Sequence, residues 1–66
     1  MKQFNMEVLV RPDPDRAAHF AAVEQAVKIR KTADNEHEAR RLVLEYVWRH
    51  RYLVVRFLTI EVRSVK

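Results

Sequence analysis

The side chains that could act as nucleophiles, bases or metal ligands are few and scattered along the chain. There is no cysteine, and the other candidates are three histidines and three aliphatic hydroxyls: His19, His37, His50, Thr32, Thr59 and Ser64. None of the hydroxyls stands in a recognisable setting with a base, and no two histidines are four residues apart, as in a helical metal site. We therefore predict that the protein is not an enzyme and uses no metal ion or cofactor.

Arginine offers a different chemistry, because its planar guanidinium group forms paired hydrogen bonds with phosphate or carboxylate groups. Residues 1–39 carry six Lys or Arg and seven Asp or Glu, whereas residues 40–66 carry seven and two. The excess positive charge predicts an anionic partner, such as RNA, DNA or an acidic protein groove; the alternative is a solvated charged face. The candidate partner-binding arginines, with a neighbouring tyrosine, are Arg40, Arg41, Arg49, Arg51, Arg56 and Tyr52.

A second candidate surface is apolar. Leu44 and Trp48 are four residues apart and project, together with Arg41, from the side of a predicted helix that lies opposite its core stripe. Tryptophan and arginine are enriched in the residues that dominate binding energy at protein interfaces. The alternative is that Trp48 folds over the end of the sheet and completes a small core.

Composition narrows the class of protein. With 66 residues the chain forms one small domain, and without glycine it has neither a phosphate-binding loop nor a dinucleotide-binding fingerprint. A residue with positive φ must then be Asn, Asp or His, or must accept strain. No apolar run approaches the ~20 residues that span a membrane, nor does the start resemble a signal peptide. We expect a cytoplasmic protein that does not bind membranes.

Two strands are predicted in the first half of the chain. Phe4, Met6, Val8 and Val10 alternate with polar residues, which predicts a half-buried strand that ends at 12–15, Pro-Asp-Pro-Asp. Residues 16–31 are ambiguous. Asp13 as N-cap and Pro14 as first helical residue favour a helix, whereas alternation after residue 22 favours a strand. We prefer an exposed connection to about residue 20 and a strand over roughly 21–31.

A helix and a long strand are predicted in the second half. The helix, over roughly 35–49, starts with Asp34 as N-cap, ends with His50 in the left-handed conformation, and has one apolar stripe. This stripe consists of Ala39, Leu42, Val43, Tyr46 and Val47. In the strand over 52–63 we expect one group of apolar residues to face the helix and another to face away. The first group is Val54, Leu58, Ile60 and Val62, and the second is Leu53, Val55 and Phe57.

This order predicts an α+β fold, in which one helix packs on one face of a three-stranded antiparallel sheet. A right-handed crossover places the first strand in the middle, antiparallel to the last. One helix covers only one face, so Leu53, Val55 and Phe57 remain exposed and offer a surface for a homodimer. Both outer strands lack an internal proline, so a partner strand can be added to either edge.

Residues 27–39, which read Val-Lys-Ile-Arg-Lys-Thr-Ala-Asp-Asn-Glu-His-Glu-Ala, combine a strand, a capping residue and an acidic helix start. Over residues 21–63 this layout resembles small phage-encoded inhibitors of host machinery, which include inhibitors of RNA polymerase and anti-CRISPR proteins. It is also similar to archaeal ribosomal protein family LX. The ribosomal family has a glycine at the turn where this chain has Arg49-His50-Arg51, and the polymerase inhibitors have an acidic helix, whereas this helix carries Arg40 and Arg41.

The resemblance implies a small viral or mobile-element regulator that binds and inhibits a host protein or protein–nucleic-acid complex, such as RNA polymerase or a CRISPR effector. The alternative is a protein that binds RNA or DNA directly through its arginines.

Overall fold

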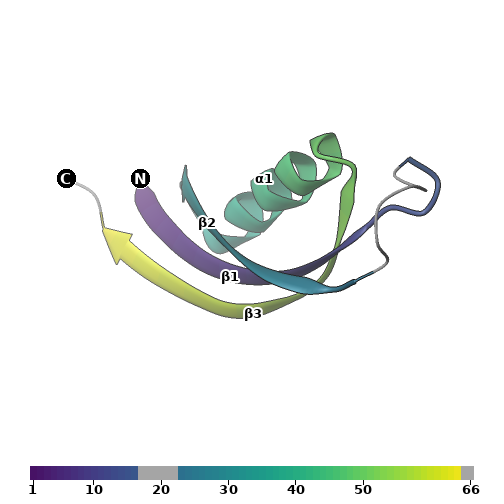
Figure 1. The fold of residues 1–66 in the computed structure, drawn as a ribbon. Coiled ribbons are helices and arrows are strands. Elements are labelled where there is room, and N and C mark those ends of the chain that lie inside the picture. Colours follow the sequence, from purple (N-terminus) through teal and green to yellow (C-terminus); the bar gives the residue numbers. More distant parts are fainter. Residues whose placement is uncertain (17–22, 65–66) are drawn as a thin grey trace.

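The computed structural model describes residues 1–16 and 23–64. These residues form a curved three-stranded antiparallel sheet, and one helix lies against its concave side (Figure 1). The elements follow the predicted order: β1 (Lys2–Pro12), β2 (Gln25–Ala33), α1 (Glu36–Arg49) and β3 (Tyr52–Ser64). The strand order β2-β1-β3 places the first strand in the middle, which confirms the predicted α+β architecture.

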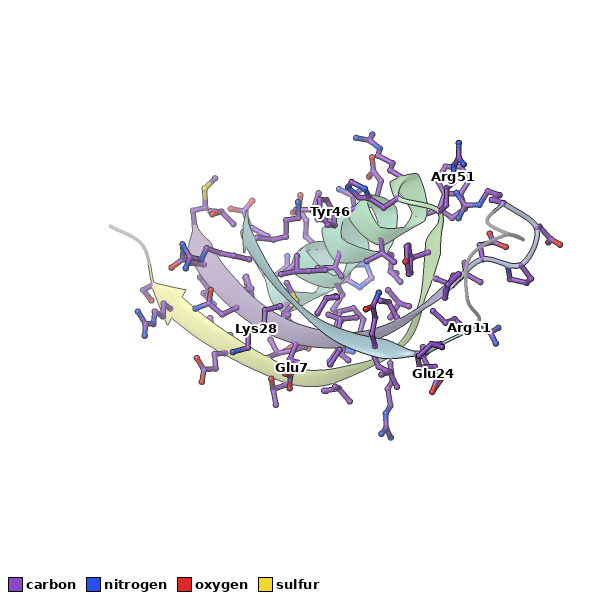
Figure 2. The ribbon with its side chains drawn as sticks, viewed as in Figure 1. Glu7, Arg11, Glu24, Lys28, Tyr46 and Arg51 are labelled. Carbon is purple, nitrogen blue, oxygen red and sulfur yellow. The ribbon has the colours of Figure 1, made fainter. Side chains whose placement is uncertain are left out.

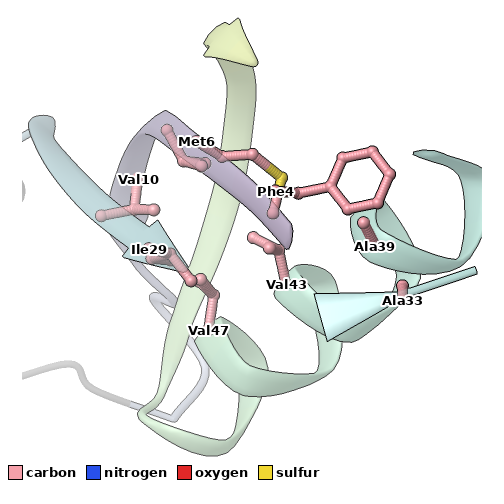
Figure 3. Packing of buried hydrophobic residues seen from close by; sticks show 9 residues of the cluster. Phe4, Met6, Val10, Ile29, Ala33, Ala39, Val43 and Val47 are labelled. Carbon is pink, nitrogen blue, oxygen red and sulfur yellow. The ribbon is translucent and has the colours of Figure 1, made fainter. Parts of the chain in front are cut away.

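β1 is the strand around which the core is built. Phe4, Met6, Val8 and Val10 are buried, and the residues between them lie on the uncovered face. Both neighbours of β1 are antiparallel to it. These four side chains form one cluster with three residues of α1 and two of β2 (Figure 3). The other members are Ala39, Val43, Val47, Ile29 and Ala33. Alternation in the sequence predicted this face correctly.

β2 shows that the later part of residues 16–31, which the sequence left open between helix and strand, is a strand. It is a strand from Gln25 to Ala33, two residues longer at its C-terminal end than predicted. Ile29 and Ala33 are buried against the core. The helix start at Asp13 is not formed, because residues 14–16 make a turn. The predictions for residues 17–22 lie outside the described residues.

The first turn of α1 is capped by Asn35, so the prediction of Asp34 as N-cap is wrong. Asn35 has an extended backbone, with φ −151° and ψ 170°, and its side-chain oxygen accepts a hydrogen bond from the Glu38 backbone N–H at 2.9 Å. Asp and Asn are both preferred N-cap residues. Asn35 is the cap here because its side-chain oxygen is the one that accepts a hydrogen bond from a free backbone N–H of the first turn.

The opposite end of α1 also differs by one residue from the prediction. His50, expected to be left-handed, has φ −90°, and Arg51 has φ +67° instead. The His50 N–H still bonds the Val47 carbonyl and the Arg51 N–H bonds the Trp48 carbonyl. These bonds close the last turn of the helix. The chain therefore reverses direction at Arg51 rather than at His50, although a residue with a side chain disfavours the left-handed conformation.

The apolar stripe of α1 is narrower than predicted. Ala39, Val43 and Val47 are buried and Leu42 is partly buried, but Tyr46 is exposed. Tyr46 lies on the side of the helix that faces β2, where the Lys31 ammonium group sits 4.4 Å from its ring centroid. Figure 2 shows Tyr46 on the helix side of the sheet.

β3 departs most from the prediction, because two β-bulges interrupt its pairing with β1. The register passes from Glu7–Thr59 to Val8–Phe57 and later from Leu9–Arg56 to Val10–Val54. Leu58 and Val55 are therefore the two extra residues. Each bulge reverses the alternation that a regular strand would keep.

The bulges exchange the places of two large side chains. Phe57 was expected on the uncovered face but pairs with Val8 and packs against the core, whereas Leu58 was expected to face the helix and is exposed. The other residues expected to face the helix do so, and Leu53 lies opposite Arg11 on the uncovered face. Val55, also expected on the uncovered face, is the extra residue of a bulge and has no partner on β1.

Candidate partner-binding surface

An open apolar groove runs between the C-terminal half of α1 and the beginning of β3. We call it the α1–β3 groove. It is lined by Leu44, Glu45, Trp48, Tyr52, Leu53, Val54 and Val55, together with Arg11 and Glu24. The Leu44 side chain is 49% exposed and that of Trp48 is 56% exposed. Two large apolar residues one helical turn apart are thus available to a partner.

The groove lies on the side of α1 that faces β3. Arg40, Leu44 and Trp48 are spaced four residues apart and so form one row along the helix. The Arg40 guanidinium lies 5.0 Å from the centroid of the Phe57 ring, which fixes the direction of this row. The sequence predicted Leu44 and Trp48 as an outward pair, and their exposure confirms that Trp48 does not fill the core.

Trp48 is held in place by a residue that the sequence did not single out. The Arg16 guanidinium stacks on the indole ring at 4.1 Å and donates a hydrogen bond to the Trp48 carbonyl. Its Nε donates to the Asp13 carboxylate at 2.7 Å. Arg16 and Trp48 are 32 residues apart in the chain, so no local pattern reveals this contact.

Asp13 connects this cluster to the start of β3. Its backbone N–H donates to the Arg51 carbonyl at 2.9 Å, and its carboxylate also accepts the Asp15 N–H at 2.9 Å. The hydrogen bond from Arg16, reinforced by the Asp15 N–H, holds the pKa of Asp13 below its ordinary value. Asp13 and Arg16 therefore fix the geometry of the groove at the end where Trp48 lies.

The helix arginines are largely matched by helix glutamates. Arg40 pairs with Glu36 at 3.1 Å, and Glu45 pairs with Arg49 at 2.6 Å and with Arg41 at 3.7 Å. Exposed pairs of this kind contribute little to stability. They do reduce the positive charge that this helix presents, so the predicted basic surface is weaker on α1 than the sequence indicated.

The remaining predicted site residues are not all brought together. Tyr52 lines the groove, but Arg51 is not among its lining residues, and Arg56 pairs with Leu9 and so points to the uncovered face. Among the described residues, neither Arg51 nor Arg56 makes an ion pair. The predicted set therefore divides between two faces.

The uncovered face of the sheet is mostly polar. On β1 it presents Gln3, Asn5, Glu7, Leu9 and Arg11. Figure 2 shows Glu7 with Lys28 of β2 on the side of the sheet away from the helix. Of the three apolar residues on which we based the predicted homodimer, Phe57 points toward the helix instead. The homodimer itself stays a prediction. The described part of this face offers no aromatic ring on which a base could stack.

Comparisons with protein-family models, with curated proteins and with solved structures found no match to this chain. The resemblance to phage inhibitors and to a ribosomal family therefore stays a prediction. Within the described residues, no helix is long and apolar enough to cross a bilayer. In the same part of the chain, no three His, Cys, Asp or Glu side chains gather as metal ligands would.

Proposed function

We propose that the chain is a small non-enzymatic binding protein, which docks on a larger protein through the α1–β3 groove and regulates that protein by occupying its surface. The observation that carries this proposal is the pair Leu44 and Trp48, half exposed in a groove while the Trp48 ring is held by Arg16. A tryptophan already fixed in its bound geometry loses little conformational entropy on binding. Its size and polar edge suit the centre of an interface.

The chemistry of the groove favours a protein partner. Its walls are mainly apolar, and its charged lining residues are Arg11, Glu24 and Glu45. A partner segment with apolar side chains in its middle and charged groups of both signs beside them would complement both features. The resemblance to phage-encoded inhibitors supports the further step that binding blocks a protein complex of a host cell.

The test is capture from a lysate of the source cells by the tagged protein, with and without nuclease. Replacing Leu44 with Ser and Trp48 with Ala should abolish capture of a defined protein, while circular dichroism shows an unchanged fold. Tyr46→Ala is the matched control, because Tyr46 is an equally exposed large residue on the opposite side of the same helix. Equal capture by the groove variant and the control would contradict the proposed surface.

Direct binding of RNA or DNA is the second candidate. It is favoured by Arg51 and Arg56, which make no ion pair among the described residues. Capture would then be sensitive to nuclease, and affinity would fall by about 0.7–0.9 log units per log unit of salt for each phosphate contacted. A flat salt dependence excludes this candidate.

A further inference from the structure

The two edges of the sheet are protected to different degrees. β2 carries Lys28, Arg30 and Lys31 near the middle of its edge, and lysine-rich edges disfavour pairing with another strand. β3 is interrupted by bulges at Val55 and Leu58, which also discourage pairing. After the second bulge, from Thr59 to Ser64, β3 pairs with β1 without any register shift. This segment is the regular, unprotected part of the sheet edge (Figure 1).

The side chains of this segment form a short symmetrical pattern around one residue. Val62 lies opposite Phe4 and so faces the helix side, yet its side chain is 50% exposed. Glu61 and Arg63, on either side of it, point to the uncovered face. Neither charge has an ion-pair partner within the described residues.

This pattern is complementary to itself. A two-fold axis perpendicular to the sheet keeps every side chain on its own face, so two antiparallel copies of the segment meet in only a few registers. A register centred on Glu61 or on Arg63 places like charges directly opposite, which is destabilising. A register centred on Ile60 gives Glu61 only Thr59 as its opposite residue.

The register centred on Val62 satisfies every group at once. Val62 meets Val62 of the second copy, and Glu61 lies opposite Arg63 of that copy on both sides of the axis. Cross-strand pairs of opposite charge and of β-branched residues are the contacts that stabilise antiparallel sheets. We propose that a second copy of this chain pairs with β3 over Ile60–Ser64 in this register, so that two three-stranded sheets join into one.

The proposed dimer is independent of the proposed function. The α1–β3 groove is built on residues 52–55, at the opposite end of β3 from the axis, so both grooves stay accessible in the dimer. The two helices lie on the same face of the joined sheet. A failure of dimerisation would therefore leave the binding of one partner segment to the groove untouched, and a failure of capture would leave the dimer untouched.

Analytical ultracentrifugation of the full chain, from about 1 μM to about 1 mM, measures the dimer directly. The variants Glu61→Arg and Arg63→Glu each replace two attractive pairs with two repulsive ones. We expect each to raise the dimer dissociation constant at least about tenfold. The double variant with both substitutions exchanges the charges and should dimerise as the wild type does. An equimolar mixture of the two single variants should form a heterodimer.

The outcomes decide the proposal in both directions. Restoration by the double variant and heterodimer formation support the register, because a merely structural effect of either substitution would not be rescued by the other. Lys28→Glu is the control, since it changes a charge on the same face at the other edge. A wild type that is monomeric up to the highest concentration overturns the proposal, as does a dimer that both single variants leave intact. Circular dichroism of each variant verifies the fold.

Discussion

Val43 and Leu44 are adjacent in α1 but have opposite roles, which makes them a sharp test of the proposed surface. The Val43 side chain is fully buried in the core, whereas that of Leu44 is half exposed in the groove. Val43→Ala removes two buried carbon atoms, worth about 0.8 kcal/mol each, and leaves a small cavity. We expect a loss of about 2 kcal/mol in the free energy of unfolding.

Leu44→Ala removes three carbon atoms of which about half the surface is already in water, and solvent fills the space. We expect this substitution to lower the free energy of unfolding by about 1 kcal/mol at most. A domain of this length has a total stability of roughly 3–10 kcal/mol, so both variants should be measurable by urea unfolding followed by circular dichroism.

Binding should show the reverse order. Leu44→Ala should lose most of the capture of the partner, while Val43→Ala, measured at low temperature where it is folded, should keep it. The reasoning would be refuted if Leu44→Ala cost as much stability as Val43→Ala, because Leu44 would then be a core residue and no free binding surface.

Three further predictions concern the ends of α1 and the Asp13 cluster. Asn35→Ala should lower the free energy of unfolding by about 1 kcal/mol through loss of the bond to the Glu38 N–H, and an unchanged urea midpoint would contradict the cap. Arg51→Gly should raise the free energy of unfolding by about 1 kcal/mol, because glycine adopts positive φ without strain. Asp13 has a folded-state pKa below its unfolded value of about 3.9, so the stability that it contributes is present above that pH and is lost as pH falls through the folded pKa. In Asp13→Asn, the free energy of unfolding, measured by urea titration at several pH values, should therefore decrease less steeply as pH falls below about 4. A decrease as steep as that of the wild type would count against this contribution of Asp13.

Periodicity in the sequence was sufficient to predict β1 and α1. On both elements the apolar residues recur with the period of the structure, and burial of Phe4 or Val43 needs no knowledge of the neighbouring strands. The predicted N-cap was wrong by one residue, because Asp34 and Asn35 are equally suitable caps and only the local backbone decides between them. The helix ends at Arg49 as predicted, but the left-handed residue after it is Arg51 and not His50.

The bulges and the Arg16 contact could not be predicted in this way. Whether Phe57 or Leu58 faces the helix depends on the register of β3 against β1, which is a property of two distant segments. The stacking of Arg16 on Trp48 likewise joins the end of one strand to the end of the helix. Both features shape the candidate surface. Of the residues that line the groove, the predicted site included Leu44, Trp48 and Tyr52, but not the others and not the Arg16 contact that holds Trp48.

The bulges also divide β3 into two parts, each of which takes part in a different proposed contact. Before and within the bulged part, the strand bends around the end of α1 and forms one wall of the groove. After it, the strand is regular and presents the self-complementary edge around Val62. A dimer joined there carries two grooves at its two ends, and a partner with two docking segments would be held more tightly than by either groove alone. Glu61→Arg should then weaken capture of such a partner without changing the affinity of one isolated segment, whereas Trp48→Ala should weaken both. This difference separates the contribution of the edge from that of the groove in a single binding assay.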